Sequence, residues 1–216
     1  MAARENVLSR IRAALGKSAS RAERGEINAY ISQHAAGPRP QAEWNLAARF
    51  RERALSLASS VDQIASIIEM PQAVARYLRE NNLPLQAVCW PEFAQLDWAA
   101  QGMNVTARPA QGNDLLGITG VFCAIAETGT VVMASGPEHP VTLNLLPDTH
   151  IVVLRESDIV GGYEEVWERL RARYGKDRMP RTVNTITGPS RTGDIEQAME
   201  LGAHGPRRMH VLVVRE

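Results

Sequence analysis

Residues 150–154 (HIVVL) and residues 209–214 (MHVLVV) are two short runs made almost entirely of β-branched and other apolar residues. Runs of this kind are typical of strands that are buried on both faces, as in a parallel sheet covered by helices. Two more apolar runs, at 118–126 and 130–134, flank Glu127, Thr128 and Gly129 and predict a hairpin. Weaker strand patterns occur at 61–68, which also suits a helical continuation, and at 87–90, 105–107 and 182–187.

Helical patterns alternate with these strands. The clearest covers residues 71–82, where Pro71 suits a first helical turn and Val74, Tyr77 and Leu78 share one face. Further helices are predicted at 41–59, 163–174 and 194–201. Strands that alternate with helices predict an α/β fold with an open, mostly parallel sheet flanked by helices.

The first forty residues differ from the rest. Residues 5–15 predict a short amphipathic helix that ends at Gly16, and residues 17–41 are polar, with a Gly-Pro-Arg-Pro stretch typical of a linker. We therefore divide the chain into an N-terminal helical arm and linker, 1–40, and an α/β domain, 41–216. The arm is expected to pack on its own domain or on a partner.

Composition excludes several classes of function. Lys plus Arg and Asp plus Glu both number 24, so no net positive field favours nucleic acid. No apolar run reaches the roughly 20 residues of a membrane span, and the N-terminus has no signal-peptide core, so we predict a cytoplasmic protein. Cys89 and Cys123 lie far apart in apolar surroundings, which predicts buried, reduced thiols that cannot hold an iron–sulfur cluster.

The loop at residues 187–194 follows a predicted strand, where open α/β sheets usually bind ligands. Its glycines permit close backbone approach, its hydroxyls can donate hydrogen bonds, and Arg191 offers a forked cation for a carboxylate or phosphate. A helix starting at Asp194 would add a positive dipole end. The alternative is ordinary helix capping by Asp194. The candidate ligand-binding residues here are Thr187, Gly188, Ser190, Arg191, Thr192 and Asp194.

Glu127 lies between two apolar runs, where a carboxylate is expected to be solvated, paired or functional. It could serve as a nucleophile or general base, or it could be a turn residue that faces water. Among the histidines, His204 lies in a glycine-rich loop and is the better site candidate, whereas His150 and His210 are interpreted as core or strand-end residues. A Ser190, His204 and Asp194 triad lacks the sequence of a nucleophile elbow.

The same segments carry a family resemblance. Residues 124–130 (AIAETGT), 146–153 (LPDTHIVV), 186–196 (ITGPSRTGDIE) and 202–207 (GAHGPR) resemble the successive signatures of the LUD domain. Residues 4–12 (RENVLSRIR) are similar to the start of LutC/YkgG proteins. The resemblance covers nearly the whole chain and is weakest in the linker.

The resemblance implies a fold similar to the NagB/RpiA/CoA-transferase group and a role in oxidising L-lactate to pyruvate. It implies two partner proteins that carry the iron–sulfur clusters, with no cofactor bound by this chain alone. By analogy with CoA transferases, Glu127 would be catalytic, although Thr128-Gly129 replaces the Asn-Gly usual in that group.

We therefore expect an accessory subunit whose loops, including Thr128, Gly129 and His204, bind a small carboxylate or phosphorylated ligand. Two alternatives stay open. The chain could be a stand-alone enzyme of the CoA-transferase or cyclo-ligase type that uses CoA, ATP or folate, or it could be a regulatory module that senses a carboxylate.

Overall fold

The computed structural model describes residues 2–16, 21–35, 37–38, 43–175, 178–195 and 198–215. The chain divides into two compact units, Met1–Pro40 and Gln41–Glu216. Within the first unit, α1 (Ala2–Leu15) ends where Gly16 adopts a φ of 61° and donates its N–H to the carbonyl of Ala13.

A second helix in this unit, α2 (Arg21–Gln33), occupies the stretch that the sequence predicted as a linker. That prediction was wrong because it gave weight to the nearby Gly-Pro pair. Ile27, Tyr30 and Ile31 recur at helical spacing, and these side chains are more than half exposed, so the helix has an apolar stripe without a core.

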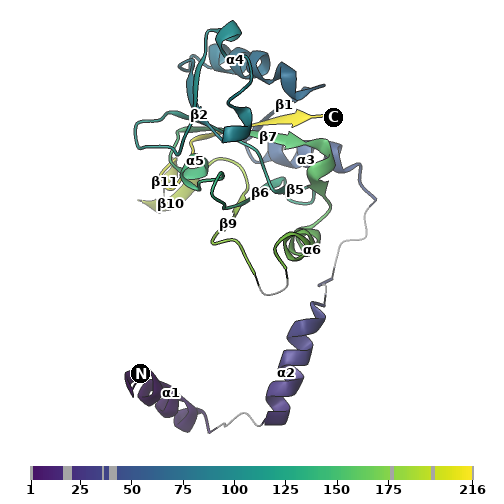
Figure 1. Ribbon diagram of the computed structural model, residues 1–216, viewed down its shortest axis with the longest axis vertical. Helices are drawn as coiled ribbons and strands as arrows, with labels where there is room; N and C mark the ends of the chain where they lie inside the picture. Colours follow the sequence, from purple (N-terminus) through teal and green to yellow (C-terminus); the bar gives the residue numbers. More distant parts are fainter. Residues whose placement is uncertain are drawn as a thin grey trace. The chain divides into compact units, whose positions relative to one another are not determined.

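The second unit holds the remaining elements (Figure 1). Its helices are α3 (Leu46–Ser56), α4 (Met70–Glu80), α5 (Thr142–Leu145) and α6 (Tyr163–Tyr174), with short 3-10 turns at Ile67–Glu69, Pro91–Phe93, Ala99–Gln101 and Glu156–Asp158. Its strands are β1 (Ser60–Ile64), β2 (Gln86–Cys89), β3 (Asn104–Ala107), β4 (Leu116–Thr119), β5 (Cys123–Ile125), β6 (Thr130–Ala134), β7 (Thr149–Arg155), β8 (Ile159–Val160), β9 (Val183–Ile186), β10 (Arg191–Ile195), β11 (Ala198–Leu201) and β12 (Arg208–Val214).

A parallel sheet of six strands, in the order β1-β12-β7-β4-β2-β3, forms the centre of this unit. Because side chains alternate along a strand, β12 sends Leu212 and Val214 into the core that contains α4, and Val211 and Val213 into the core that contains α3. The predicted open, mostly parallel sheet flanked by helices is confirmed. The likeness to the NagB/RpiA/CoA-transferase group stays a prediction.

A smaller mixed sheet, in the order β8-β5-β6-β9, lies between the α3 face of the parallel sheet and α6 (Figure 1). The predicted hairpin is confirmed, since β5 and β6 pair antiparallel around residues 126–129. The apolar run 118–126 is not one strand, however. It leaves the parallel sheet at Thr119 and enters the small sheet at Cys123.

The predicted helix at 194–201 is wrong. The structure has an antiparallel pair, β10 and β11, in which Arg191 lies opposite Leu201 and Thr192 opposite Glu200. Thr192 and Ile195 are β-branched residues, which favour strands, and Gly193 lowers helix propensity. No helix therefore follows the 187–193 loop, and neither a helix dipole nor helix capping explains that loop.

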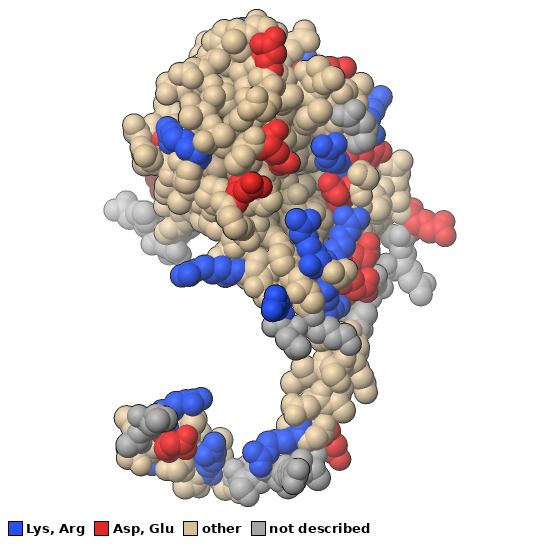
Figure 2. Space-filling model, viewed as in Figure 1, with Lys and Arg blue, Asp and Glu red and all other residues tan. Residues whose placement is uncertain are grey.

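The prediction of buried, reduced cysteines agrees with the structure. Cys89 and Cys123 are free and buried, and burial raises the pKa of Cys89 to about 11 and that of Cys123 to about 12. On the face shown in Figure 2, basic and acidic side chains of the second unit are interspersed. Among the described helices, none is both long enough and apolar enough to cross a bilayer.

Candidate functional site

A cavity of about 260 Å³, lined by both polar and apolar residues, lies where the parallel sheet, the small sheet and the β10–β11 hairpin meet. The residues lining it come from α5, from the starts of β7, β10 and β12, from the end of β9, and from the loops that follow β9 and β11. They are Asn144, Leu145, His150, Thr185, Ile186, Thr187, Gly188, Pro189, Ser190, Arg191, His204, Gly205, Pro206 and Met209.

His150 forms part of the cavity wall although its side chain is fully buried. Its Nε2 atom lies 2.8 Å from the hydroxyl of Thr119, and its Nδ1 atom has no hydrogen-bond partner among the described residues. Burial lowers the pKa of His150 to about 3, so the ring is neutral near pH 7 and carries a single N–H.

The position of that proton depends on whether the Thr119 hydroxyl donates to Nε2 or accepts from it. The Thr119 hydroxyl has two choices, the Nε2 atom of His150 and the Sδ atom of Met133 at 4.0 Å. An imidazole nitrogen is the stronger acceptor. If the hydroxyl donates to Nε2, Nδ1 carries the proton and is an unpaired donor; if Nε2 donates to the hydroxyl and the hydroxyl donates to Sδ, Nδ1 is an unpaired acceptor.

Asn144 provides a second buried polar group. It lies on α5, its side chain is 2% exposed, and its Oδ1 atom has no partner among the residues that the structure describes. A buried polar atom without a partner costs about 1–3 kcal/mol, so such atoms often mark a place where a ligand or water binds. Two residues that line the cavity therefore each carry a buried polar atom without a partner among the described residues.

The positive charge at the cavity comes from Arg191, the first residue of β10. Arg191 lines the cavity, is exposed, and forms no ion pair with the described part of the chain. Gly188 shapes the loop for packing reasons, because its φ is 77° and a Cβ atom there would lie 2.5 Å from the carbonyl oxygen of Leu57. Glycine at this position therefore lets the loop pack closely against the end of α3.

Of the residues predicted as a site, five line this cavity: Thr187, Gly188, Ser190, Arg191 and His204. Ser190 accepts a hydrogen bond at 3.3 Å from the backbone N–H of His204, so these two residues meet through the backbone. Thr192 is buried outside the lining, and the side chain of Asp194 lies outside the described residues.

The segment around Glu127 is linked to the cavity-lining residue Thr187 by hydrogen bonds between threonine hydroxyls. The Thr130 hydroxyl lies 2.7 Å from that of Thr128 and 2.7 Å from that of Thr187. Glu127 is half-buried beside Gly162 and does not line the cavity. Gly129, with a φ of 68°, packs against the backbone of α3. The two segments are therefore joined, but the carboxylate of Glu127 is not part of the cavity wall.

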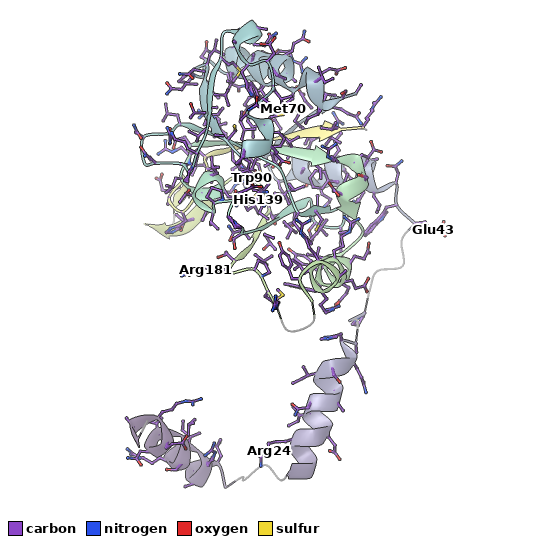
Figure 3. The ribbon with its side chains drawn as sticks, viewed as in Figure 1. Arg24, Glu43, Met70, Trp90, His139 and Arg181 are labelled. Atoms are coloured by element: carbon purple, nitrogen blue, oxygen red, sulfur yellow. The ribbon has the colours of Figure 1, made fainter. Side chains whose placement is uncertain are left out.

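The cavity lies beyond the amino ends of β7 and β12, where His150 and Met209 stand, and not at the carboxyl edge that the sequence argument assumed. The reason is that the strands preceding the two loops, β5 and β9, belong to the smaller sheet. At the carboxyl edge, Trp90 follows β2 and stacks on His139 with ring centroids 4.1 Å apart (Figure 3).

Two other hollows lie near that carboxyl edge. One of about 60 Å³ is bordered by Glu92 and Arg155. A wider groove of about 740 Å³ runs along α3 and is bordered by Gln63 and Arg215, which bond to each other at 2.7 Å. Neither is bordered by a buried polar atom without a partner.

Acid should destabilise the protein through its buried histidines. Burial also lowers the pKa of His210 to about 4. Below pH 6.5 the unfolded chain takes up protons that folded His150 and His210 do not, so stability is complete above this pH and falls as the pH drops toward 4. We expect the free energy of unfolding to fall by about 1 kcal/mol per pH unit for each histidine.

Urea unfolding measured between pH 7 and pH 4.5 checks this expectation. A His150→Gln variant should show about half of the pH dependence of the unaltered protein. An identical dependence in the two proteins would contradict the assignment of His150 as a buried neutral residue.

Fold and cavity together define an α/β protein with a six-stranded parallel sheet, a small second sheet and a cavity where the two sheets meet. A family model described as the LUD domain matches residues 47–214, and the chain belongs to the LUD domain family. A crystal structure of a DUF162 family protein from Deinococcus radiodurans has the same fold, with a TM-score of 0.60, 27% identity, and coverage of 81% of this chain and 99% of that one.

Three relatives show which proteins this chain is similar to in sequence. Over 184 residues the chain is 32% identical to lactate utilization protein C of Deinococcus radiodurans, covering 82% of this chain and 83% of that protein. It is 31% identical over 131 residues to lactate utilization protein C of Bacillus subtilis, covering 59% of this chain and 54% of that protein. An uncharacterized Neisseria meningitidis protein is 37% identical over 98 residues, and that match spans 45% of this chain and 41% of the relative.

Proposed function

We propose that this chain is a non-redox component of an L-lactate oxidation system and that its cavity binds a small 2-hydroxy carboxylate. The names of the relatives support the metabolic setting. The observation that carries the ligand assignment is the composition of the cavity lining, which combines the buried His150 and Asn144 with the cationic Arg191.

A 2-hydroxy carboxylate has functional groups that these three side chains can bind. Its carboxylate suits the forked guanidinium of Arg191. In the tautomer that protonates Nδ1 of His150, the hydroxyl of the ligand can accept from this N–H and donate to the Oδ1 atom of Asn144, because a hydroxyl is both donor and acceptor.

The same argument predicts selectivity. A 2-oxo acid presents a carbonyl oxygen, which accepts but cannot donate, so the Oδ1 atom of Asn144 would stay unpaired. We expect L-lactate to bind about fivefold more tightly than pyruvate, which corresponds to about 1 kcal/mol. Calorimetric titration of both ligands tests this, and an Asn144→Leu variant should bind them equally. A preference for pyruvate in the unaltered protein would contradict the role of Asn144.

The redox step is assigned to partners. An iron–sulfur cluster takes four thiolate ligands as a rule, and this chain has two cysteines, both buried. The groups that carry the electrons would therefore belong to iron–sulfur proteins of the same system. In this account the chain supplies a ligand site to the assembly.

Reconstitution tests the proposed function. The full chain, tagged and expressed with its own genomic neighbours, should co-purify with iron–sulfur proteins, and the complex should reduce a dye with L-lactate. The isolated chain should not turn lactate over, and an Arg191→Ala chain should assemble normally while slowing the complex. Dye reduction by the isolated chain, or full activity of a complex without it, would overturn the proposal.

A further inference from the structure

A second cavity, of about 390 Å³, lies on the other face of β12. Because side chains alternate along the strand, His210 points toward α4 while the neighbouring Val211 faces α3. Ser59, Ser60, Tyr77 and Arg208 are among the residues that line this space. Apart from Met209, which borders both cavities, it shares no lining residue with the first.

The cavity is bordered by two buried polar groups that the fold leaves without partners. His210 is 1% exposed, its Nδ1 atom lies 2.8 Å from the hydroxyl of Ser60, and its ring stacks on Tyr77 with centroids 4.0 Å apart. The Nε2 atom of His210 and the hydroxyl of Ser59, which is 5% exposed, have no hydrogen-bond partner among the described residues. These contacts hold the His210 ring in place and leave Nε2 as a buried atom without a partner beside the cavity.

The charged residues around this cavity favour an anion. Arg207 and Arg208 are exposed, and neither forms an ion pair within the described ranges. Asp62 is neutralised by Arg76, whose guanidinium lies 2.7 Å from its carboxylate. Glu80 is the one acidic lining residue of the described chain that remains without a cationic partner. Among described residues, the lining therefore has two unpaired cations, Arg207 and Arg208, and one unpaired anion, Glu80, which gives it a net positive charge.

We propose that this cavity is a second binding site, for a small organic oxyanion that also carries a hydroxyl group. The oxyanion, a carboxylate or a phosphate monoester, would contact Arg207 and Arg208, and the hydroxyl would bond to His210 Nε2 and Ser59. The volume is within the range of small-molecule sites. None of the residues that carry the proposed function is among the proposed contacts of this second site, so the two proposals can be tested separately.

Nuclear magnetic resonance of the full chain labelled with 15N-histidine tests the proposal. The probes are glycerate, glycerol 3-phosphate and, as the uncharged control, glycerol. The ring signals of His210, assigned with a His210→Gln variant, should shift saturably with one or both anions and not with glycerol. The stronger of the two anions identifies the site as one for carboxylates or for phosphate esters.

Two variants separate this site from the first. Arg208→Ala should weaken the response of His210 by about tenfold, because a charge-assisted hydrogen bond is lost. Arg191→Ala should leave it unchanged. Ser59→Ala, a small change that removes an unpaired hydroxyl, should also weaken the response while the protein stays folded. A His210 signal that no anion shifts, or a shift that survives Arg208→Ala, overturns the second site, and a response of His150 alone supports only the first.

Discussion

A Gly188→Ala variant is expected to lose about 3 kcal/mol of folding stability, the largest effect of any single methyl group considered for this protein. Two costs add. An alanine at a φ of 77° is strained by about 1–2 kcal/mol, and its Cβ atom would lie 2.5 Å from the carbonyl oxygen of Leu57, closer than packed atoms approach. The loop that carries Arg191 would have to move away from the end of α3. Urea unfolding at pH 7 measures the loss.

Two other glycines separate the costs. Gly102 also has a positive φ, 69°, but a Cβ atom added there would have no described atom within 4 Å, so Gly102→Ala should cost about 1 kcal/mol. Gly112 has neither feature, and Gly112→Ala should change stability by less than about 0.5 kcal/mol. If Gly188→Ala were as mild as Gly102→Ala, the contact with Leu57 would not determine the position of the loop.

An Arg191→Ala variant is expected to bind L-lactate about 30-fold more weakly, which corresponds to about 2 kcal/mol. The guanidinium is the cation that lines the cavity in the described chain, and removing it leaves the carboxylate of the ligand without a charged partner. Because Arg191 is exposed and forms no ion pair with described residues, the thermal midpoint of the ligand-free protein should hardly change.

Controls for this variant come from a second arginine and from Glu127. Arg181→Ala removes an exposed cation from the segment that leads into β9 (Figure 3) and should leave the affinity unchanged. Glu127→Gln should also leave it unchanged, since Glu127 does not line the cavity. Equal weakening by Arg181→Ala would indicate a general charge effect. Loss of affinity in Glu127→Gln would instead favour the CoA-transferase alternative.

Much of the fold could be predicted from local patterns. Residues 150–154 and 209–214 lie side by side in the parallel sheet, because continuous apolar runs suit strands that are covered on both faces. The helix at 163–174 matches α6 at both ends. Periodicity could not reveal that residues 118–126 pass from one sheet to another, since every residue of β4 and β5 is buried and the pattern does not change.

The candidate site was predicted less completely. The glycine-rich loop and Arg191 could be found because their residue types suit anion binding. His150 and Asn144 could not, because a histidine at the start of an apolar strand and an asparagine in a short helix look like structural residues. Only the structure shows that a polar atom of each is buried without a partner. The LPDTH segment was a signal, since it places a histidine inside a family signature.

The most direct test of the account is a crystal structure of the full chain grown with L-lactate at a concentration that saturates the calorimetric titration. The account predicts ligand density in the cavity, with the carboxylate on Arg191 and the hydroxyl within hydrogen-bond distance of His150 Nδ1 and Asn144 Oδ1. Lactate found elsewhere on the chain while this cavity stays free of it would contradict the central claim.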